Sequence, residues 1–384
     1  MNAEAADPVG LTCRIAEKHA QETDLAATFP DQALDAMRRT GLLGLMVPAE
    51  FGGGNGTLAD LADTTVRLGR ADMSVAMIFA MHCQQVVALN RYGCGKLRSQ
   101  VLPAVADGKV YLASVTTEFG KGGHLLTSQS PVENIDGVLQ IRREAPIVTG
   151  GMHADGFLIT MQTPGATSPA QVDLVYAARD QLRVETCGDW QPLGMRATES
   201  LPLRLTGSVP DWHIIGEPGD FRSIATQVFA PLAHIGWAAA WLGTAAGACS
   251  RVVQHFRSAS GHSQVSPASE LLLARLAAAR AKLDVAHALL RHTIRVVESQ
   301  DDLSGPPFQL LINTLKTQAA EDCFAAVNEL VELIGLRHGY LAQSPLRLER
   351  AFRDLRSASL NYANDRLRLA NGSLALMDSE VCLA

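Results

Sequence analysis

The sequence predicts an α+β protein of three consecutive parts: a helical N-terminal domain, a central β domain and a C-terminal helical bundle. Residues up to about 108 and beyond about 219 show apolar side chains at helical spacing, whereas residues from about 110 to 215 form short runs rich in β-branched side chains. Because helices and strands do not alternate along the chain, this order argues against a doubly wound sheet and an α/β barrel. We expect domains at 1–109, 110–216 and 217–384.

The first part is predicted to consist of short amphipathic helices separated by turns, such as Phe29-Pro30-Asp31 and the glycine-rich run 50–54. In the second part, Gly, Pro, Asp and Asn separate a series of candidate strands. These runs are 111–115, 138–144, 145–151, 156–162, 171–177, 182–188 and 201–207.

The third part contains the strongest helical patterns of the chain. Ser266-Pro267 predicts a helix start, with an N-cap serine and a proline in the first turn, and Leu272 through Val297 supply an apolar face. A second helix is predicted over 307–334, with Gly335 as its stop. Helices of this length bury their apolar faces against one another, which predicts a bundle.

Composition excludes several classes of function. The formal net charge is −6, so neither nucleic acid nor an anionic membrane is an expected partner. The seven cysteines contain no CxxC pair, and the histidines form no convincing ligand pair, so we expect no metal site. The first residues do not resemble a signal peptide and no long apolar run follows, so we expect a cytoplasmic protein.

Familiar catalytic motifs are missing. The chain has no G-x-S-x-G elbow, no phosphate loop, no H-E-x-x-H and no G-x-G-x-x-G between a strand and a helix. The run Gly120-Lys121-Gly122-Gly123 follows a strand, and its backbone suits an approach to an anionic ligand. An ordinary turn is the alternative for this run.

Five ordered segments nevertheless resemble the acyl-CoA dehydrogenases. They are FPDQALDAMRRTGLLGLMVPAEFGGG at 29–54, SVTTEFGKGG at 114–123, APIVTGGMHAD at 145–155, WQPLGMRATES at 190–200 and GYLAQSPLRLERAFRDLR at 339–356. The resemblance covers nearly the whole chain. It implies a helical N-terminal domain, a central β-sandwich or barrel domain and a C-terminal four-helix bundle, assembled as a homodimer or homotetramer.

The resemblance also implies bound FAD, held between the β domain and the terminal bundle, with its pyrophosphate reaching a neighbouring subunit. By position, Thr117 and Thr149 match the threonines that hydrogen-bond the flavin ring, where donors tune the ring electronics. For each, a threonine selected for β propensity is the alternative. Ile147 stands where many members of the family place a tryptophan against the flavin.

Other positions are matched to the phosphates and the adjoining loop. Gly122 and Gly123 would present backbone N–H groups, and Arg257 would direct its guanidinium at the pyrophosphate of a partner subunit. Gly335 and Gly339 would let the backbone approach FAD. A helix stop is the alternative for Gly335, and an ordinary surface arginine is the alternative for Arg257.

The base of a typical acyl-CoA dehydrogenase is absent. Tyr362 falls on the position of the family's glutamate, and Phe229 falls near the alternative position on an earlier helix. A phenol with a pKa of about 10 is ionised in roughly one molecule per thousand at pH 7, a handicap of about 4 kcal/mol as a base. Asp365 lies on the adjoining helical turn and is a second candidate, with a solvated helix charge as the alternative. His82 and His338 are further candidates, and a structural histidine is the alternative that we favour for each.

Three functions follow as hypotheses. The first is an FAD-dependent oxidoreductase acting on the CH–CH group of an acyl thioester, with Tyr362 or Asp365 in an atypical active site. The second is a monooxygenase of the same fold that uses FMN or reduced flavin as co-substrate, in which Tyr362, His82 or His338 would hydrogen-bond the peroxide or orient the substrate. A flavin reductase or an electron-transfer protein would then be a partner. The third is a flavin-binding homologue without catalysis.

Overall fold

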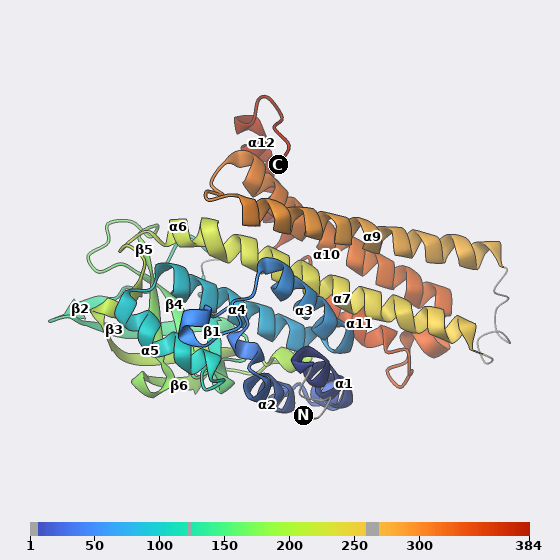
Figure 1. The fold of residues 1–384 in the computed structure, drawn as a ribbon, viewed down its shortest axis with the longest axis horizontal. Coiled ribbons are helices and arrows are strands. Elements are labelled where there is room, and N and C mark those ends of the chain that lie inside the picture. The colour runs from blue at the N-terminus through green and yellow to red at the C-terminus, as the bar shows by residue number, and fades with distance from the viewer. Residues whose placement is uncertain (1–6, 121–123, 259–268) are drawn as a thin grey trace. The chain divides into compact units, whose positions relative to one another are not determined.

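The computed structural model describes residues 7–120, 124–258 and 269–384, and its order of helices, strands and helices confirms the predicted α+β class (Figure 1). The helices of the first part are α1 (Pro8–Ala26), α2 (Asp31–Thr40), α3 (Leu58–Ala71), α4 (Met73–Tyr92) and α5 (Gly95–Ala106), with 3-10 turns at Leu42–Gly44 and Ala49–Phe51. The last part contains α6 (Phe221–Ile224), α7 (Ala230–Arg257), α9 (Glu270–Ser299), α10 (Pro306–Ile334), α11 (Leu348–Arg356) and α12 (Asn364–Met377), with π-helical turns at Ala225–Phe229 and Leu336–Tyr340.

The strands between these helices form two sheets. They are β1 (Leu112–Val115), β2 (Glu133–Ile135), β3 (Val138–Val148), β4 (Gly156–Gln162), β5 (Val172–Ala178), β6 (Leu182–Thr186), β7 (Leu201–Pro210) and β8 (Ile214–Ile215). One sheet has the order β1-β4-β5-β8 and the other β2-β3-β7-β6. β1 pairs with β4 in parallel, and the remaining neighbours are antiparallel. The predicted runs fall on these strands, except that 138–144 and the start of 145–151 form one strand, β3.

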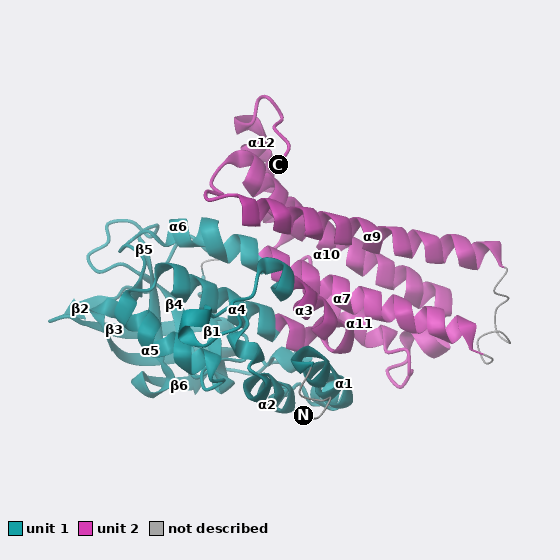
Figure 2. Ribbon diagram, in the orientation of Figure 1, with its two compact units in different colours: residues 1–61, 78–191, 196–233 teal, residues 62–77, 192–195, 234–384 magenta. Residues whose placement is uncertain are grey.

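The chain divides into two compact units, shown in Figure 2. Unit 1 comprises residues 1–61, 78–191 and 196–233, and unit 2 comprises 62–77, 192–195 and 234–384. Within unit 2, α3 packs closely on α7, because a Cβ added to Gly69 would lie 2.6 Å from the Ala240 carbonyl oxygen. A Cβ on Gly243 would lie 2.3 Å from the Val66 carbonyl oxygen. α3 therefore packs with the terminal helices, although the sequence places it in the first helical part.

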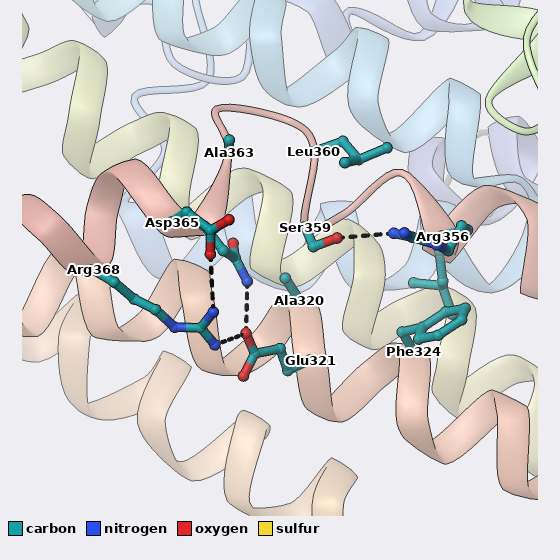
Figure 3. Close-up of a pocket in the computed structure, with 11 residues that line it drawn as sticks. Ala320, Glu321, Phe324, Arg356, Ser359, Leu360, Ala363, Asp365 and Arg368 are labelled. Carbon is teal, nitrogen blue, oxygen red and sulfur yellow. Dashed lines mark hydrogen bonds and ion pairs between the residues drawn. The ribbon is translucent and has the colours of Figure 1, made fainter.

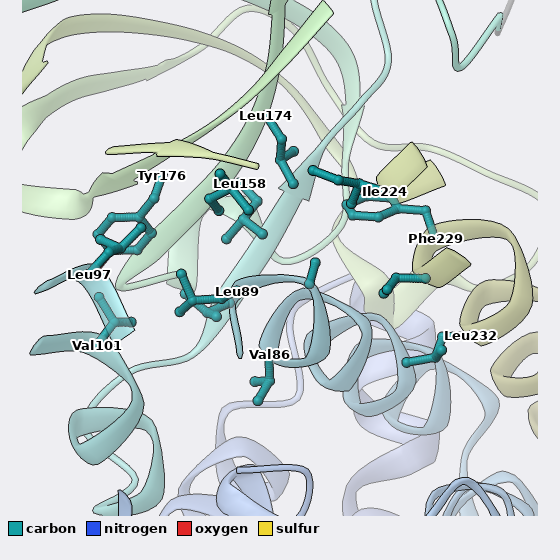
Figure 4. Packing of buried hydrophobic residues seen from close by; sticks show 14 of the residues in the cluster. Val86, Leu89, Leu97, Val101, Leu158, Leu174, Tyr176, Ile224, Phe229 and Leu232 are labelled. Atoms are coloured by element: carbon teal, nitrogen blue, oxygen red, sulfur yellow. The ribbon is translucent and has the colours of Figure 1, made fainter. Parts of the chain in front are cut away.

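The core of unit 1 lies between the β1-β4-β5-β8 sheet and the helices that cover it. Leu158 and Leu174 come from the sheet, and Leu89 and Val101 come from α4 and α5 (Figure 4). Phe229 belongs to the same cluster and is 3% exposed. Its position, which the sequence comparison matched to an alternative site for a base, is therefore part of a packed apolar core.

The two long helices agree with the sequence, with one correction. Ser266 and Pro267 lie outside the described residues, and the N-cap of α9 is Ser269, whose hydroxyl accepts a hydrogen bond from the Leu272 N–H at 3.4 Å. α10 ends as predicted at Gly335, which has φ +76°. A positive φ of this size is accessible to glycine at little cost, which explains the stop.

Two stretches are long and apolar enough to cross a membrane, Met73–Tyr92 and Phe221–Arg257. In each, 83% of the apolar window is buried inside the protein. Their apolar side chains are therefore engaged in packing within the fold, as expected for core helices.

Candidate functional site

An irregularity in β3 sets the geometry around the two threonines that were matched to the flavin. Pro146 lacks an N–H, and the pairing of β3 with β7 shifts register between Ala145 and Val148. Strict alternation would bury Ile147, because Arg143 and Ala145 face inward, but Ile147 is 48% exposed. The bulge therefore turns an apolar side chain out of the sheet, as bulges beside functional sites do.

Thr117 and Thr149 use their hydroxyls within unit 1. Thr117 Oγ1 donates to the Ile147 carbonyl oxygen at 2.7 Å and accepts from the Ile147 N–H at 3.3 Å. Thr149 Oγ1 lies 3.0 Å from Ser200 Oγ, and Ser200 Oγ lies 2.8 Å from Thr198 Oγ1. The Thr117 hydroxyl proton is thus committed to the protein, whereas Thr149 retains a donor whenever Ser200 donates to it.

A buried ion pair that the sequence analysis missed holds the segment that carries Thr117. The Arg143 guanidinium is fully buried and lies 2.8 Å from the Glu118 carboxylate. Arg143 Nη2 also donates to the Thr117 carbonyl oxygen at 2.8 Å. Glu118 accepts in addition from the Gln129 N–H at 3.0 Å and from the Ser130 hydroxyl. This network fixes the backbone next to Ile147.

The residues matched to the FAD phosphates are distributed over several segments. Gly122 and Gly123 lie outside the described residues. Arg257 is the exposed last residue of α7 and lines a groove of 520 Å³ together with Arg70 and Arg280. Asp284 also lines this groove and pairs with Arg280 at 2.8 Å, so part of the positive charge is already compensated.

The two glycines of the loop after α10 differ in their surroundings. A Cβ on Gly335 would meet open space, and the positive φ alone selects glycine there. A Cβ on Gly339 would lie 2.5 Å from the Val331 carbonyl oxygen. Gly339 is therefore required by the packing of the π-helical turn on α10, whether or not a ligand approaches it.

The turn between α11 and α12 carries Tyr362 and leads into Asp365. Tyr362 has φ +51° and is 37% exposed, and burial raises the pKa of its phenol above the usual 10. The side chain of Asp365 is 95% exposed and lies 3.4 Å from Arg368. Arg368 also binds Glu321, which accepts a hydrogen bond from Asn364 Nδ2 at 2.9 Å (Figure 3). The structure thus brings Asp365 to a guanidinium rather than leaving its carboxylate free.

Glu321, Asp365 and Arg368 border a cavity of 430 Å³, whose lining does not include Tyr362. Its lining comprises Ala320, Glu321, Phe324, Leu355, Arg356, Ser359, Leu360, Ala363, Asn364, Asp365 and Arg368 (Figure 3). Both carboxylates in this lining are bound to Arg368. The Arg356 guanidinium is oriented by Ser359 Oγ at 3.0 Å and lies over the Phe324 ring.

A second buried cation escaped the sequence analysis. The Lys316 side chain in α10 is completely buried, and its Nζ donates to the Ala358 carbonyl oxygen at 3.1 Å and to the Tyr362 carbonyl oxygen at 3.0 Å. A third bond goes to Asn364 Oδ1 at 2.7 Å. Nζ also lies 5.7 Å from the centre of the Trp241 ring, within reach of a cation–π interaction.

His82, predicted as a catalytic candidate, has a different environment. It is fully buried, its Nδ1 accepts from the Leu112 N–H at 3.0 Å, and its Nε2 lies 3.0 Å from the Leu43 carbonyl oxygen. Burial lowers the pKa of His82 to about 4. Because both ring nitrogens bind backbone groups, the neutral Nε2–H tautomer is fixed and no nitrogen is left to move a proton. These hydrogen bonds favour a structural role for His82, and its catalytic role stays a prediction.

The chemistry of unit 1 fits a flavin ring. The exposed Ile147 offers an apolar surface, Thr117 hydrogen-bonds the backbone of Ile147, and the Thr149 hydroxyl follows two residues further along the chain. A planar ring with polar edges requires this combination. Among the residues that the structure describes, no group of three or more His, Cys, Asp or Glu side chains is arranged to hold a metal ion.

Comparisons with known proteins identify the family to which the chain belongs. The family models of the acyl-CoA dehydrogenase N-terminal and C-terminal domains match residues 11–109 and 235–365. An amino sugar nitrososynthase of Streptomyces peucetius is 24% identical, and the match covers 90% of this chain and 86% of that protein. The dibenzothiophene monooxygenase TdsC of Paenibacillus sp. A11-2, solved with FMN and indole, superimposes with a TM-score of 0.86 at 21% identity over 98% of each chain. Butyryl-CoA dehydrogenase of Megasphaera elsdenii superimposes with a TM-score of 0.83 at 18% identity, over 98% of this chain and 99% of that one. The chain belongs to the acyl-CoA dehydrogenase superfamily.

Proposed function

We propose that the protein is a flavin-dependent monooxygenase that oxygenates a nitrogen or sulfur atom of a small molecule. This proposal is carried by Tyr362, whose phenol stands where the sequence resemblance places the family's glutamate. Burial raises the pKa of this phenol, so at neutral pH it is a proton donor and a poor base. Removal of the α-proton of an acyl thioester needs an acceptor instead.

The carboxylates near Tyr362 do not fill this role. Asp365 and Glu321 both lie against the Arg368 guanidinium. Each carboxylate is therefore already engaged by a cation, and the Asp365 side chain is in addition 95% exposed to solvent. We therefore prefer oxygenation to the dehydrogenation of an acyl thioester that the resemblance first implies.

Oxygenation gives each candidate residue a role suited to its chemistry. When bound, reduced flavin supplies two electrons, so that one atom of dioxygen enters the substrate and the other leaves as water. Tyr362 donates a hydrogen bond or a proton to the oxygen that is being reduced. In unit 1, Ile147 excludes water from the ring surface, Thr149 donates to the ring edge when Ser200 donates to it, and Thr117 holds the backbone of Ile147. The relatives support this choice of substrate, since one is described as an amino sugar nitrososynthase and another as a dibenzothiophene monooxygenase.

The test supplies reduced FAD or FMN from NADH and a flavin reductase, under isotope-labelled dioxygen, with a panel of amines and aromatic sulfur compounds. We expect the label in the product, and about 10²-fold slower product formation for Tyr362→Phe. Tyr92→Phe, a partly exposed tyrosine of α4, is the matched control and should keep wild-type activity.

A parallel anaerobic arm adds acyl-CoA thioesters of varied length to the oxidised holoprotein. Bleaching of the flavin by any of them, together with unlabelled products in the first arm, would contradict oxygenation and favour the dehydrogenase. The same preparation shows whether FAD or FMN is retained, and light scattering checks the homodimer or homotetramer that the resemblance implies.

A further inference from the structure

A completely buried lysine binds the turn that carries Tyr362. The ammonium group of Lys316 has three N–H donors, and three oxygen acceptors surround it at 2.7–3.1 Å. Two of them are the main-chain carbonyls of Ala358 and Tyr362, and the third is the side chain of Asn364, the first residue of α12. One cation thus joins the beginning of the turn, its end and the following helix.

The acceptors indicate what this cation does. A buried charge is costly and is normally compensated by direct pairing with an opposite charge. Here the bonded oxygens belong to carbonyl and amide groups, so the interaction organises the backbone. Lys316 projects from the middle of α10, a helix of 29 residues that packs against α9, α11 and α12. The anchor is therefore rigid, and the turn is the part that is held.

The conformation of Tyr362 needs such a constraint. Its φ of +51° lies in the left-handed region, which a bulky residue adopts only when its surroundings impose it. The Lys316 bond to the Tyr362 carbonyl oxygen acts on this residue directly. Loss of that bond would let the backbone return to an ordinary φ and would swing the phenol away from its present direction.

We propose that Lys316 is a positioning residue that fixes the direction of the Tyr362 phenol for the reaction. This inference rests on the proposed function. It separates two tasks within unit 2, because Tyr362 donates to the reacting oxygen and Lys316 determines where that donor points. Lys316 itself remains covered by the bundle and does not touch the substrate.

The test is a double-mutant cycle on product formation by the holoenzyme. Lys316→Met keeps the length of the side chain and removes all three donors. We expect kcat to fall roughly tenfold or more, with KM within about twofold. In the Tyr362→Phe background we expect Lys316→Met to change kcat by less than about twofold, because the group that it positions is already gone. Lys282→Met, at a partly exposed lysine of α9, is the control and should resemble wild type in both backgrounds.

A second measurement keeps the inference testable if Lys316→Met does not fold. Asn364→Ala removes one acceptor and leaves the two carbonyls, so it should lower kcat by a smaller factor with the same dependence on Tyr362. In the wild type, kcat should also fall as pH rises through about 7, because burial lowers the pKa of Lys316 to that value and a neutral amine has one donor fewer. The other titratable groups around Lys316 are Glu321 on α10, Arg368 on α12, Tyr362 and the buried His234 of α7.

The outcomes separate the two proposals. One contrary result is that Lys316→Met lowers kcat by the same factor with and without the Tyr362 hydroxyl, and another is that it does not lower kcat at all. Either result would overturn the positioning role of Lys316 and leave the proposed oxygenation intact. Full activity of Tyr362→Phe would overturn the proposed function, and the positioning role would fall with it.

Discussion

Replacement of Lys316 by methionine should remove a large pH dependence of stability. Burial lowers the pKa of Lys316 from its ordinary 10.5 to about 7. Below pH 7 the folded and unfolded chains both carry the proton on Lys316. This group therefore causes no change of the free energy of unfolding with pH in that range. Between pH 7 and 10.5 the unfolded chain binds a proton that the folded chain lacks, so the free energy of unfolding rises with pH. The free energy of unfolding rises by ~1.4 kcal/mol per pH unit, which gives a total increase of roughly 5 kcal/mol between pH 7 and pH 10.5.

The assay is denaturant unfolding across this window, followed by the fluorescence of the four tryptophans. The difference between wild type and Lys316→Met should grow by up to roughly 5 kcal/mol from pH 7 to pH 10.5, since groups shared by both proteins cancel. The free energy of unfolding of the control variant Lys282→Met should change with pH in the same way as that of the wild type. Parallel curves for Lys316→Met would refute the reasoning, because they would mean that the buried amine keeps its proton throughout.

Three further substitutions test the networks around the candidate site. His82→Phe leaves the Leu43 carbonyl oxygen and the Leu112 N–H without their partner. It should lower the free energy of unfolding by roughly 2–4 kcal/mol, measured by denaturant unfolding. A variant with wild-type stability and no turnover would instead indicate a catalytic role for His82. Glu118→Gln leaves the fully buried guanidinium of Arg143 without its counter-charge and should cost ~3–5 kcal/mol in the same assay, and a loss below 1 kcal/mol would contradict the pairing. Gly339→Ala forces a Cβ against a carbonyl oxygen of α10 and should destabilise the protein by ~1–3 kcal/mol in thermal unfolding. Gly372→Ala in α12, where a Cβ meets open space, is the control and should be neutral or stabilising. Equal changes of the melting temperature in the two variants would contradict this account.

Local patterns in the sequence predicted most of the fold. The β-branched runs fall on strands, and the stripe that ends at Gly335 is α10, because hydrophobic periodicity reports which side of an element is buried. The start of α9 shows the limit of this reasoning. Ser266 and Ser269 are both followed by helix-forming residues, and a local pattern does not decide which serine caps the helix.

Features that depend on tertiary packing escaped the same reasoning. α3 follows the first helices in the chain yet packs on α7, through a contact that Gly69 and Gly243 permit at positions 174 residues apart. Strict alternation along β3 predicts that the Ile147 side chain points inward. It points outward because the register of the pairing between β3 and β7 shifts around Pro146. Proline inside a strand was a usable signal for a bulge, and it would have predicted that the residue matched to the flavin face is exposed.

The two buried cations, one in each unit, share a signal that is visible in the sequence. Arg143 has the same strand phase as the buried Ile141, and Lys316 lies on the buried stripe of α10 beside Leu315 and Ala319. Periodicity therefore predicts that both are buried, and the cost of burying a charge requires that each has polar partners. The partners come from distant segments, such as Asn364 for Lys316, so the sequence shows that a network must exist and the fold shows which segment it holds. Each cation holds an irregular backbone segment that carries a candidate residue, and substitutions at these cations should therefore separate orientation from chemistry more cleanly than substitutions at the candidate residues.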